Sequence, residues 1–156
     1  MKSNFKFFKN SKSLPVDRFF QNVLYDEKIG YYNSKVPFGA EGDFVTAPSI
    51  SNLFSEMIAI WIISTWEIFN KPKNINIIEL GSGDGRLIEI MLKVFSRFPK
   101  FNKAKNIYSL EKSKYLKKIQ KKKFRNSEVK WINDVKEIKI GPVIFFGNEF
   151  FDAIPI

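Results

Sequence analysis

The sequence predicts an α/β fold of Rossmann-like type, in which short parallel strands alternate with helices. Three observations support this prediction. Apolar runs of strand length recur with helical patterns between them, a glycine-rich turn joins one such run to a helix, and polar residues follow each run. Strand–helix alternation at this spacing indicates βαβ units, a parallel sheet and right-handed crossovers.

The composition supports a packed domain and excludes several kinds of catalytic site. The chain has 156 residues, 44% of them hydrophobic and 17 of them Phe, which is enough for a substantial core. It contains no Cys and no His. Disulfides, thiolate chemistry, Cys/His zinc sites and His-based triads are therefore excluded, and we predict no metal site.

The net charge of +10 raises the question of a nucleic-acid partner. The basic residues are nearly all Lys and accompany abundant Asn, Ile and Phe, a mixture that an AT-rich coding sequence produces whatever the function. We therefore do not expect a nucleic-acid partner. The longest apolar run, Met57–Ile63, is far shorter than the ~18 residues of a membrane span. Residues 1–12 lack the apolar core of a signal peptide and the Arg content of a transit peptide.

The first third of the chain is predicted to contain one helix and one long loop. Pro15 begins the helix, Val16–Tyr25, because its fixed φ suits the first helical turn, and residues at helical spacing give that helix an apolar face. From Gly30 to Pro48 we predict a loop, and loops of this length are typically functional or flexible. Its last part, residues 42–48, is predicted to be a short extended piece before the next helix.

The next predicted helix runs from Ser49 to Phe69, with Ser49 or Ser51 as its N-cap. Its middle, Met57–Ile63, is apolar all round, so we expect it to be buried on most sides. We also expect the three large aromatic residues of this helix to pack in the core. They are Trp61, Trp66 and Phe69.

The centre of the chain is predicted to be a strand, a glycine turn and a helix. Ile75–Leu80 has the length and β-branched content of a buried strand. Gly81, Gly83 and Gly85 follow at every second position, where glycine permits positive φ and lets a ligand approach without meeting a Cβ. The helix after them, which we expect to continue to about Phe98, presents unpaired N–H groups at its start.

Two cofactor classes use such a turn, dinucleotides and cofactors that carry a cationic amino group. The residues around the turn distinguish between them. A dinucleotide fingerprint has its third glycine one residue later, where this chain has Arg86. Glu79, at the end of the strand, would repel a pyrophosphate but suits a cationic amino group. The alternative is a glycine-rich strand–helix turn that binds no ligand.

The second half of the chain supplies one more helix and three more strands. The helix, Ser113–Phe124, has a narrow apolar stripe surrounded by lysines. We interpret the lysines as a solvated face, with contact to RNA as the minor alternative. The predicted strands are Ile107–Leu110, Val129–Ile132 and Pro142–Phe146.

Polar residues follow the carboxyl end of every predicted strand. In a parallel sheet these ends share one edge, where ligands bind near the switch point of the strand order. The convergence is more specific than the glycines alone and predicts a site at that edge. The groups are the glycine turn, Glu111, Asn133 with Asp134, and Asn148 with Glu149.

Three motifs, in their order and spacing, resemble the MidA-type methyltransferases, bacterial relatives of the mitochondrial complex I assembly arginine methyltransferase. They are Gly42-Asp-Phe-Val-Thr-Ala-Pro48, Glu79-Leu-Gly-Ser-Gly-Asp-Gly85 and Asn148-Glu-Phe-Phe-Asp-Ala-Ile-Pro155. The resemblance extends from about Pro15 onward, and the third motif is the most specific. Ser82 and Ser49 depart from the family, which usually has Pro and an acidic residue at these positions.

The resemblance implies a class I methyltransferase fold with S-adenosyl-L-methionine as cofactor. That sheet has seven strands in the order 3-2-1-4-5-7-6, whereas we predict four here, so the parallel sheet would be truncated after its fourth strand and leave an apolar edge. We therefore expect the chain to be the N-terminal part of a longer enzyme. Residues 1–72 would form a helical and loop extension on the lid and substrate side, and residues 73–156 the first half of the cofactor-binding domain.

The resemblance also implies which residues bind the cofactor. Glu79 would lie near its amino end, Glu111 would accept from the ribose hydroxyls, and Asp134 would accept from the adenine amino group. The glycines would let the backbone approach the cofactor closely. The full set is Glu79, Gly81, Ser82, Gly83, Gly85, Glu111 and Asp134.

For the reaction, the resemblance implies a protein arginine as acceptor. Glu149 would orient the guanidinium, with Asn148 beside it and Asp152 in reserve. The alternative is that Glu149 and Asp152 cap the turn after the fourth strand. Asp43 and Thr46 would belong to a lid over the cofactor or, alternatively, cap the next helix.

The implied function is methyl transfer to a protein substrate such as a respiratory complex I subunit. Two alternatives stay open: a non-catalytic assembly factor that binds the cofactor, and an RNA methyltransferase that uses the lysine-rich helix. The expected location is the cytoplasm of a bacterium, or the mitochondrial matrix if the source is eukaryotic. The sequence does not determine the oligomeric state.

Overall fold

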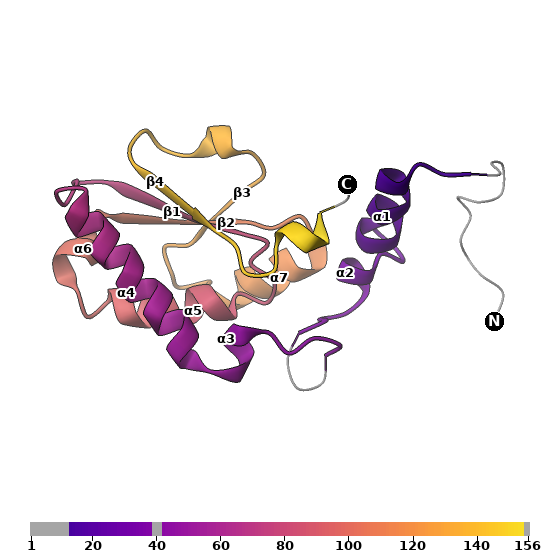
Figure 1. Ribbon diagram of the computed structural model, residues 1–156, viewed down its shortest axis with the longest axis horizontal. Coiled ribbons are helices and arrows are strands. Elements are labelled where there is room, and N and C mark those ends of the chain that lie inside the picture. Colours follow the sequence, from indigo (N-terminus) through magenta and orange to yellow (C-terminus); the bar gives the residue numbers. More distant parts are fainter. Residues whose placement is uncertain (1–12, 39–41, 155–156) are drawn as a thin grey trace.

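The computed structural model describes residues 13–38 and 42–154. The lead at residues 1–12, residues 39–41 of the predicted loop, the last residue of the third motif (Pro155) and Ile156 therefore lie outside the described part. Within the described residues, four helices precede the first strand, and helical segments separate each strand from the next (Figure 1). The elements are α1 Val16–Tyr25, α2 Tyr31–Ser34, α3 Ala47–Ile50, α4 Asn52–Ile68, β1 Ile75–Leu80, α5 Arg86–Phe95, α6 Pro99–Ala104, β2 Lys105–Leu110, α7 Lys114–Lys123, β3 Lys130–Ile132, η2 Val135–Glu137, β4 Val143–Phe146 and η3 Phe151–Ala153.

The four strands form one parallel sheet in the order β3-β2-β1-β4, which confirms the predicted α/β fold and the start of the predicted strand order. β1 is central, and Ile78 in its middle lies opposite Tyr108 of β2 and Phe145 of β4. β4 is an edge strand of this sheet, and its Phe145 side chain is half exposed. The apolar edge predicted from the sequence is therefore present among the described residues.

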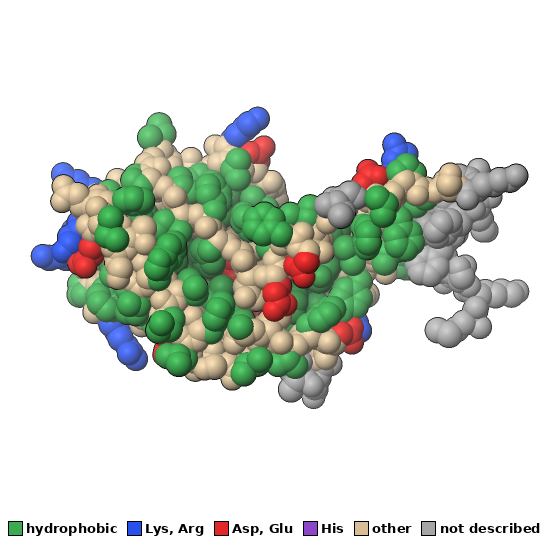
Figure 2. Space-filling model, in the orientation of Figure 1, with side chains coloured by type: hydrophobic (Ala, Val, Ile, Leu, Met, Phe, Trp, Pro, Cys, Tyr) green, Lys and Arg blue, Asp and Glu red, His purple; other side chains and the backbone are tan. Residues whose placement is uncertain are grey.

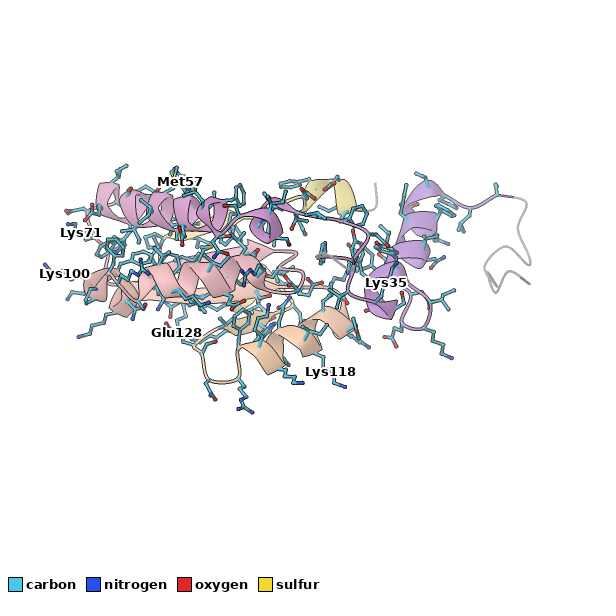
Figure 3. The ribbon with its side chains drawn as sticks, turned by 90° about the horizontal axis from the view of Figure 1, so that it is seen from below. Lys35, Met57, Lys71, Lys100, Lys118 and Glu128 are labelled. Carbon is cyan, nitrogen blue, oxygen red and sulfur yellow. The ribbon has the colours of Figure 1, made fainter. Side chains whose placement is uncertain are left out.

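The larger helices cover one face of the sheet (Figure 3). The main core lies on this face, where α4, α5 and α6 pack on β1, β2 and β4. The smaller core on the opposite face consists of Ile78, Tyr108 and Ile132, covered in part by Ile138 of the segment between β3 and β4. A right-handed return from β3 to β4 has to cross this second face. Because all four strands are parallel, their carboxyl ends lie together at one edge of the sheet.

Several predicted boundaries were wrong. The long helix is broken at Ser51, so α3 and α4 are separate helices. Ser51 caps α4 by accepting from the Leu53 N–H, which confirms one of the two predicted N-caps. The predicted loop contains α2 and a β-bridge between Phe38 and Phe44. The helix after the glycine turn ends at Phe95, and Pro99 begins the additional helix α6. Proline at the first helical position separates these two helices, since it cannot continue a helix from the preceding turn.

The predicted burial of α4 on most sides was also wrong. Its inner face is in the core with Ala59, Ile62 and Trp66, but Met57 is 63% and Trp61 is 55% exposed, and Phe69 is exposed as well. Figure 2 shows apolar side chains along this outer face of α4. A helix that packs against a single sheet buries only one stripe of its surface. None of the described helices combines the length and hydropathy needed to cross a membrane.

We expect this 156-residue chain to self-associate through the outer face of α4, because contiguous exposed apolar surface favours aggregation. Replacing Met57 by Lys and Trp61 by Glu together should lower the average mass in sedimentation velocity at every concentration tested. Replacing Lys118 by Ala is the control, since Lys118 projects from α7 on another side of the molecule (Figure 3). A wild-type chain that sediments as a monomer throughout the concentration series would contradict this expectation.

Candidate functional site

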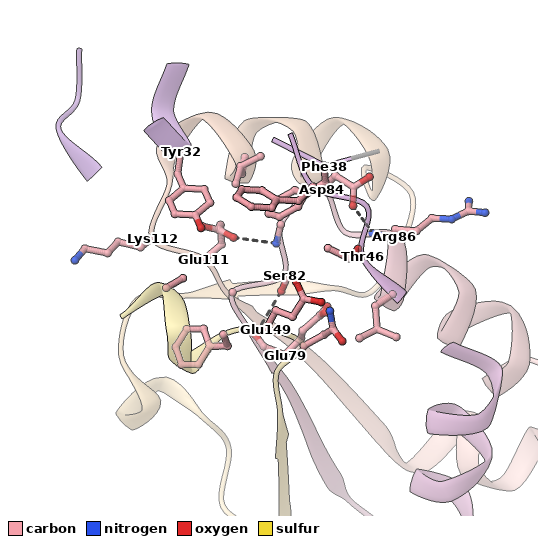
Figure 4. Close-up of a pocket in the computed structure, with 18 of the residues that line it drawn as sticks. Tyr32, Phe38, Thr46, Glu79, Ser82, Asp84, Arg86, Glu111, Lys112 and Glu149 are labelled. Atoms are coloured by element: carbon pink, nitrogen blue, oxygen red, sulfur yellow. Dashed lines mark hydrogen bonds between the residues drawn. The ribbon is translucent and has the colours of Figure 1, made fainter. Parts of the chain in front are cut away.

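A cavity of about 320 Å³ lies at the carboxyl ends of the strands (Figure 4). It is bounded by the end of β1, the glycine turn, the start of the β2–α7 loop, the segment after β4, and residues of α1, α2 and the 38–48 region. Eight residues of the predicted site line it, which confirms that they converge. They are Glu79, Gly81, Ser82, Gly83, Glu111, Asn148, Glu149 and Asp152.

The glycine turn needs glycine at its first two positions. Gly81 and Gly83 have φ of 64° and 55°, in the left-handed region that side chains rarely adopt. A Cβ on Gly81 would lie 2.7 Å from the ring of Phe150, and one on Gly83 would lie 2.9 Å from the ring of Phe38. Both rings line the cavity, so a side chain at either glycine would displace part of the cavity wall.

Gly85 differs from the other two glycines of the turn because it does not line the cavity. Its φ is 79°, and a Cβ there would lie 2.7 Å from the ring of Phe124, at the end of α7. The position is therefore constrained by the packing of the turn against α7.

A buried network of polar side chains from β2, α7 and β3, which the sequence analysis did not predict, supports the glycine turn. The Gln120 amide donates to the Gly83 carbonyl at 2.7 Å and accepts from Trp131 Nε1 and Ser109 Oγ, both at 2.8 Å. Ser109 Oγ also contacts Ser82 Oγ at 2.9 Å. The available sequence signals were a Ser inside an apolar strand and a Gln close to the apolar stripe of the lysine-rich helix. Neither indicated which groups they would meet.

Glu79 is the most unusual residue of the site. Its side chain is buried at the end of β1, it lines the cavity, and its Oε2 has no hydrogen-bond partner among the described residues. Burial raises the pKa of Glu79 to about 8, and the nearby carboxylates of Glu111 and Asp84 raise it further, against a hydrogen bond with Ser82. An unpartnered buried carboxylate is costly unless a proton or a cation neutralises it. The site is therefore suited to a ligand with a positive charge near Glu79.

Glu111 is also buried, but both of its oxygens accept backbone hydrogen bonds. The Gly83 N–H donates to Oε2 at 3.1 Å and the Ser113 N–H donates to Oε1 at 2.8 Å. Burial raises the pKa of Glu111, and these hydrogen bonds oppose the shift. Each carboxylate oxygen keeps a second lone pair, so Glu111 can still accept from hydroxyl groups in the cavity.

Two predicted residues lie outside the cavity lining. Asp134 accepts from the Lys136 N–H and caps η2, in a capping box with Glu137, so the predicted adenine contact has no support from the lining. Asp43 accepts from the Tyr31 hydroxyl and pairs with Lys35, both at 2.5 Å. Thr46 does line the cavity, and it makes no side-chain cap to α3.

The segment after β4 brings Asn148, Glu149 and Asp152 to the cavity. Glu149 has φ of 50°, an unusual backbone conformation for a residue other than glycine. The 3₁₀-helix η3 begins after Phe150 with no side-chain cap. The capping alternative for Glu149 and Asp152 thus has no hydrogen bond to support it within residues 13–38 and 42–154. Their carboxylates are available to a ligand.

Comparisons with known proteins agree with this geometry. Residues 57–156 match the family described as "Putative S-adenosyl-L-methionine-dependent methyltransferase". The mitochondrial protein arginine methyltransferase NDUFAF7 of Xenopus laevis is 31% identical over 172 residues, covering 95% of this chain and 39% of the relative. The NDUFAF7 homolog of Drosophila melanogaster is 30% identical, covering 92% of this chain and 38% of the relative.

A solved structure is similar as well. A Burkholderia thailandensis protein with bound S-adenosyl-homocysteine has a TM-score of 0.70 and 27% identity, covering 91% of this chain and 38% of that chain. The present chain thus spans about two fifths of the length of the relatives it matches. The family match itself covers more than half of this chain. The chain therefore belongs to this S-adenosyl-L-methionine-dependent methyltransferase family.

Proposed function

We propose that this chain binds S-adenosyl-L-methionine and takes part in transferring its methyl group to a protein arginine. The observation that carries the proposal is the buried, unpartnered carboxyl of Glu79 beside the glycine turn. The cofactor has an ammonium group on its methionyl end, which would neutralise Glu79 and provide its missing partner. The names of the arginine methyltransferase relatives support the choice of acceptor.

The residues present fit the rest of the cofactor. Gly81 and Gly83 offer close approach to the backbone, and Glu111 offers acceptors for two adjacent ribose hydroxyls. Ser82 lines the cavity and its hydroxyl contacts Ser109 in the buried network, so its role would be to hold the turn. Gly85 also supports the turn, through its packing on α7.

The proposed chemistry needs positioning more than acid–base power. When bound, the cofactor supplies a methyl group on a sulfonium, so that a nucleophile would attack the methyl carbon directly and the sulfur would leave as a neutral thioether. Glu149 would accept N–H groups of the guanidinium, orient one nitrogen toward the methyl carbon, and take up the proton released from that nitrogen. Asn148 would add a donor or an acceptor beside it, and Asp152 a second negative charge.

As the protein substrate we propose a complex I subunit, in the mitochondrial matrix of a eukaryotic source or in the cytoplasm of a bacterial one. The motif resemblance and the mitochondrial relatives support this choice. Residues 1–72 would form the side of the site that faces this substrate, although α4 also packs in the main core.

The test is to titrate the chain with S-adenosylhomocysteine by calorimetry and then to measure transfer of a labelled methyl group. We expect saturable one-site binding and label on arginine of an added Arg-containing protein. Binding with no transfer to any protein of a cell extract would favour a non-catalytic assembly factor. Label in RNA, with steeply salt-dependent RNA binding, would favour an RNA methyltransferase. Absence of binding would reject the proposal.

A further inference from the structure

The lining of the cavity also includes two tyrosines from the N-terminal helices. Tyr25 ends α1, Tyr32 lies in α2, and both line the cavity. Their ring centroids are 5.5 Å apart with 30° between the ring planes. Figure 4 shows Tyr32 beside Glu111 at the rim of the pocket.

Both tyrosines are fixed to the cofactor side of the molecule. The Tyr25 hydroxyl donates to the Ala153 carbonyl of η3 at 3.1 Å. Ser113, which begins α7, donates from its hydroxyl to the Tyr32 carbonyl at 2.6 Å. The two rings are therefore positioned by the segment after β4 and by the β2–α7 loop, the same two segments that carry the acidic residues of the site.

The surroundings of the tyrosines are acidic. Burial is the main cause that raises the pKa of Tyr32, followed by the charges of Asp152, Glu111 and Glu149. Burial likewise raises the pKa of Tyr25 to about 12. Both phenols thus remain neutral, and the negative charge near them attracts a cation to the ring faces.

A cation of the chain itself already uses this surface. Lys112 Nζ lies 4.4 Å from the centroid of the Tyr25 ring, within the range of a cation–π contact, and donates to Gln21 Oε1 at 2.6 Å. The Tyr32 ring has no such cation among the described residues. The Phe38 ring stacks on the Tyr32 ring with the centroids 6.5 Å apart, whereas the Tyr32 hydroxyl makes no hydrogen bond to another described residue, so the hydroxyl end of this ring is available to a ligand.

We propose that Tyr25 and Tyr32 form an aromatic wall that holds the cationic end of the acceptor side chain against the carboxylates of Glu149 and Asp152. This inference rests on the proposed function, and it assigns acceptor selectivity to α1 and α2. A guanidinium is flat and weakly hydrated, so it can stack on a ring while its N–H groups pair with a carboxylate. A lysine ammonium is compact and strongly hydrated, and it has no planar fork of donors that can pair with a carboxylate while the group stacks flat on a ring. The wall would therefore favour arginine over lysine.

The experiment measures peptide binding to the full 156-residue chain saturated with S-adenosylhomocysteine. The probes are one arginine peptide and the same peptide with lysine at that position. We expect tighter binding of the arginine peptide, a loss of about fivefold or more in Tyr32→Leu, and a change within about twofold in Tyr32→Phe. Tyr115→Leu is the matched control, because Tyr115 lies on α7 outside the cavity lining. Affinity for S-adenosylhomocysteine should be the same in all four proteins.

The outcomes separate this inference from the proposed function. If S-adenosylhomocysteine binds but the two peptides bind the wild type equally, or if Tyr32→Leu and Tyr115→Leu lose the same affinity, the aromatic wall is rejected and cofactor binding stands. If S-adenosylhomocysteine does not bind the wild type, the proposed function itself fails. Equal binding of the two peptides by the wild type rejects the aromatic wall even if Tyr32→Leu does not fold.

Discussion

Replacing Glu79 by Gln should stabilise the ligand-free protein at pH 8. The same substitution should weaken the binding of S-adenosylhomocysteine by about 10- to 100-fold, the usual loss when a charge-assisted hydrogen bond is removed. The stability change follows from the pKa of about 8 in the folded state, against an ordinary value of 4.5. Between these two pH values the unfolded chain releases a proton that the folded chain keeps. Wild-type stability therefore falls as pH rises through this window, by up to about 1.4 kcal/mol per pH unit.

The Gln side chain does not ionise, so the variant should lack this pH dependence. Thermal melts from pH 5 to pH 8 would measure it, with an expected difference at pH 8 of a few kcal/mol, equivalent to about 2–4 °C for each kcal/mol. Glu56→Gln is the matched control, because Glu56 is exposed on α4. If the melting temperatures of wild type and Glu79→Gln change in parallel between pH 5 and pH 8, the argument that burial raises the pKa of Glu79 is contradicted.

Ligand binding gives a second, independent readout for Glu79. An ammonium group beside the carboxyl favours its ionised form, so binding at pH 7 should release close to one proton from the wild type and none from Glu79→Gln. Calorimetry in two buffers of different ionisation enthalpy measures this number. An affinity for S-adenosylhomocysteine that is unchanged by the substitution would remove Glu79 from the cofactor site.

Replacing Glu149 by Gln should reduce the rate of methyl transfer by about 100-fold or more. Affinity for the cofactor should stay within about threefold of the wild-type value. Glu149 lines the cavity from the segment after β4 and does not cap η3, whereas Glu79 and Glu111 lie near the glycine turn. Its carboxylate is thus proposed to act on the acceptor alone. Gln retains the shape but loses the charge that orients a guanidinium and takes up its proton.

The measurement pairs labelled methyl transfer with calorimetric titration of S-adenosylhomocysteine on the same preparations. Asp152→Asn tests the reserve carboxylate and should have a smaller effect, and Glu56→Gln again controls for loss of a surface charge. Arginine-peptide affinity in the presence of S-adenosylhomocysteine should fall with Glu149→Gln as well. Equal loss of cofactor binding and transfer would show that Glu149 supports the structure and not the reaction.

The sequence alone was enough to predict the sheet and the edge where the site lies. β1 was predicted residue for residue, because a β-branched apolar run bounded by glycine has few alternatives. The parallel order and right-handed crossovers then placed the strand ends together. Glu79, Glu111 and Glu149 consequently met at one cavity, although nothing in the sequence measured their distances or their burial.

Tertiary packing alone decided which face of each element was used. α4 is apolar all round, so its sequence could not show that Trp66 would be buried and Trp61 exposed. Gly85 resembled the other glycines of the turn, yet it packs against the Phe124 ring at the end of α7 and does not line the cavity.

The same holds for Tyr25 and Tyr32, which reach the cavity because α1 and α2 dock against the carboxyl ends of the strands. Periodicity along the chain determines what an element can bury, whereas the partners that actually cover it come from distant parts of the sequence. These long-range contacts raise the pKa of Glu79, hold the glycine turn through Gln120, and place the Tyr25 and Tyr32 rings side by side at the cavity.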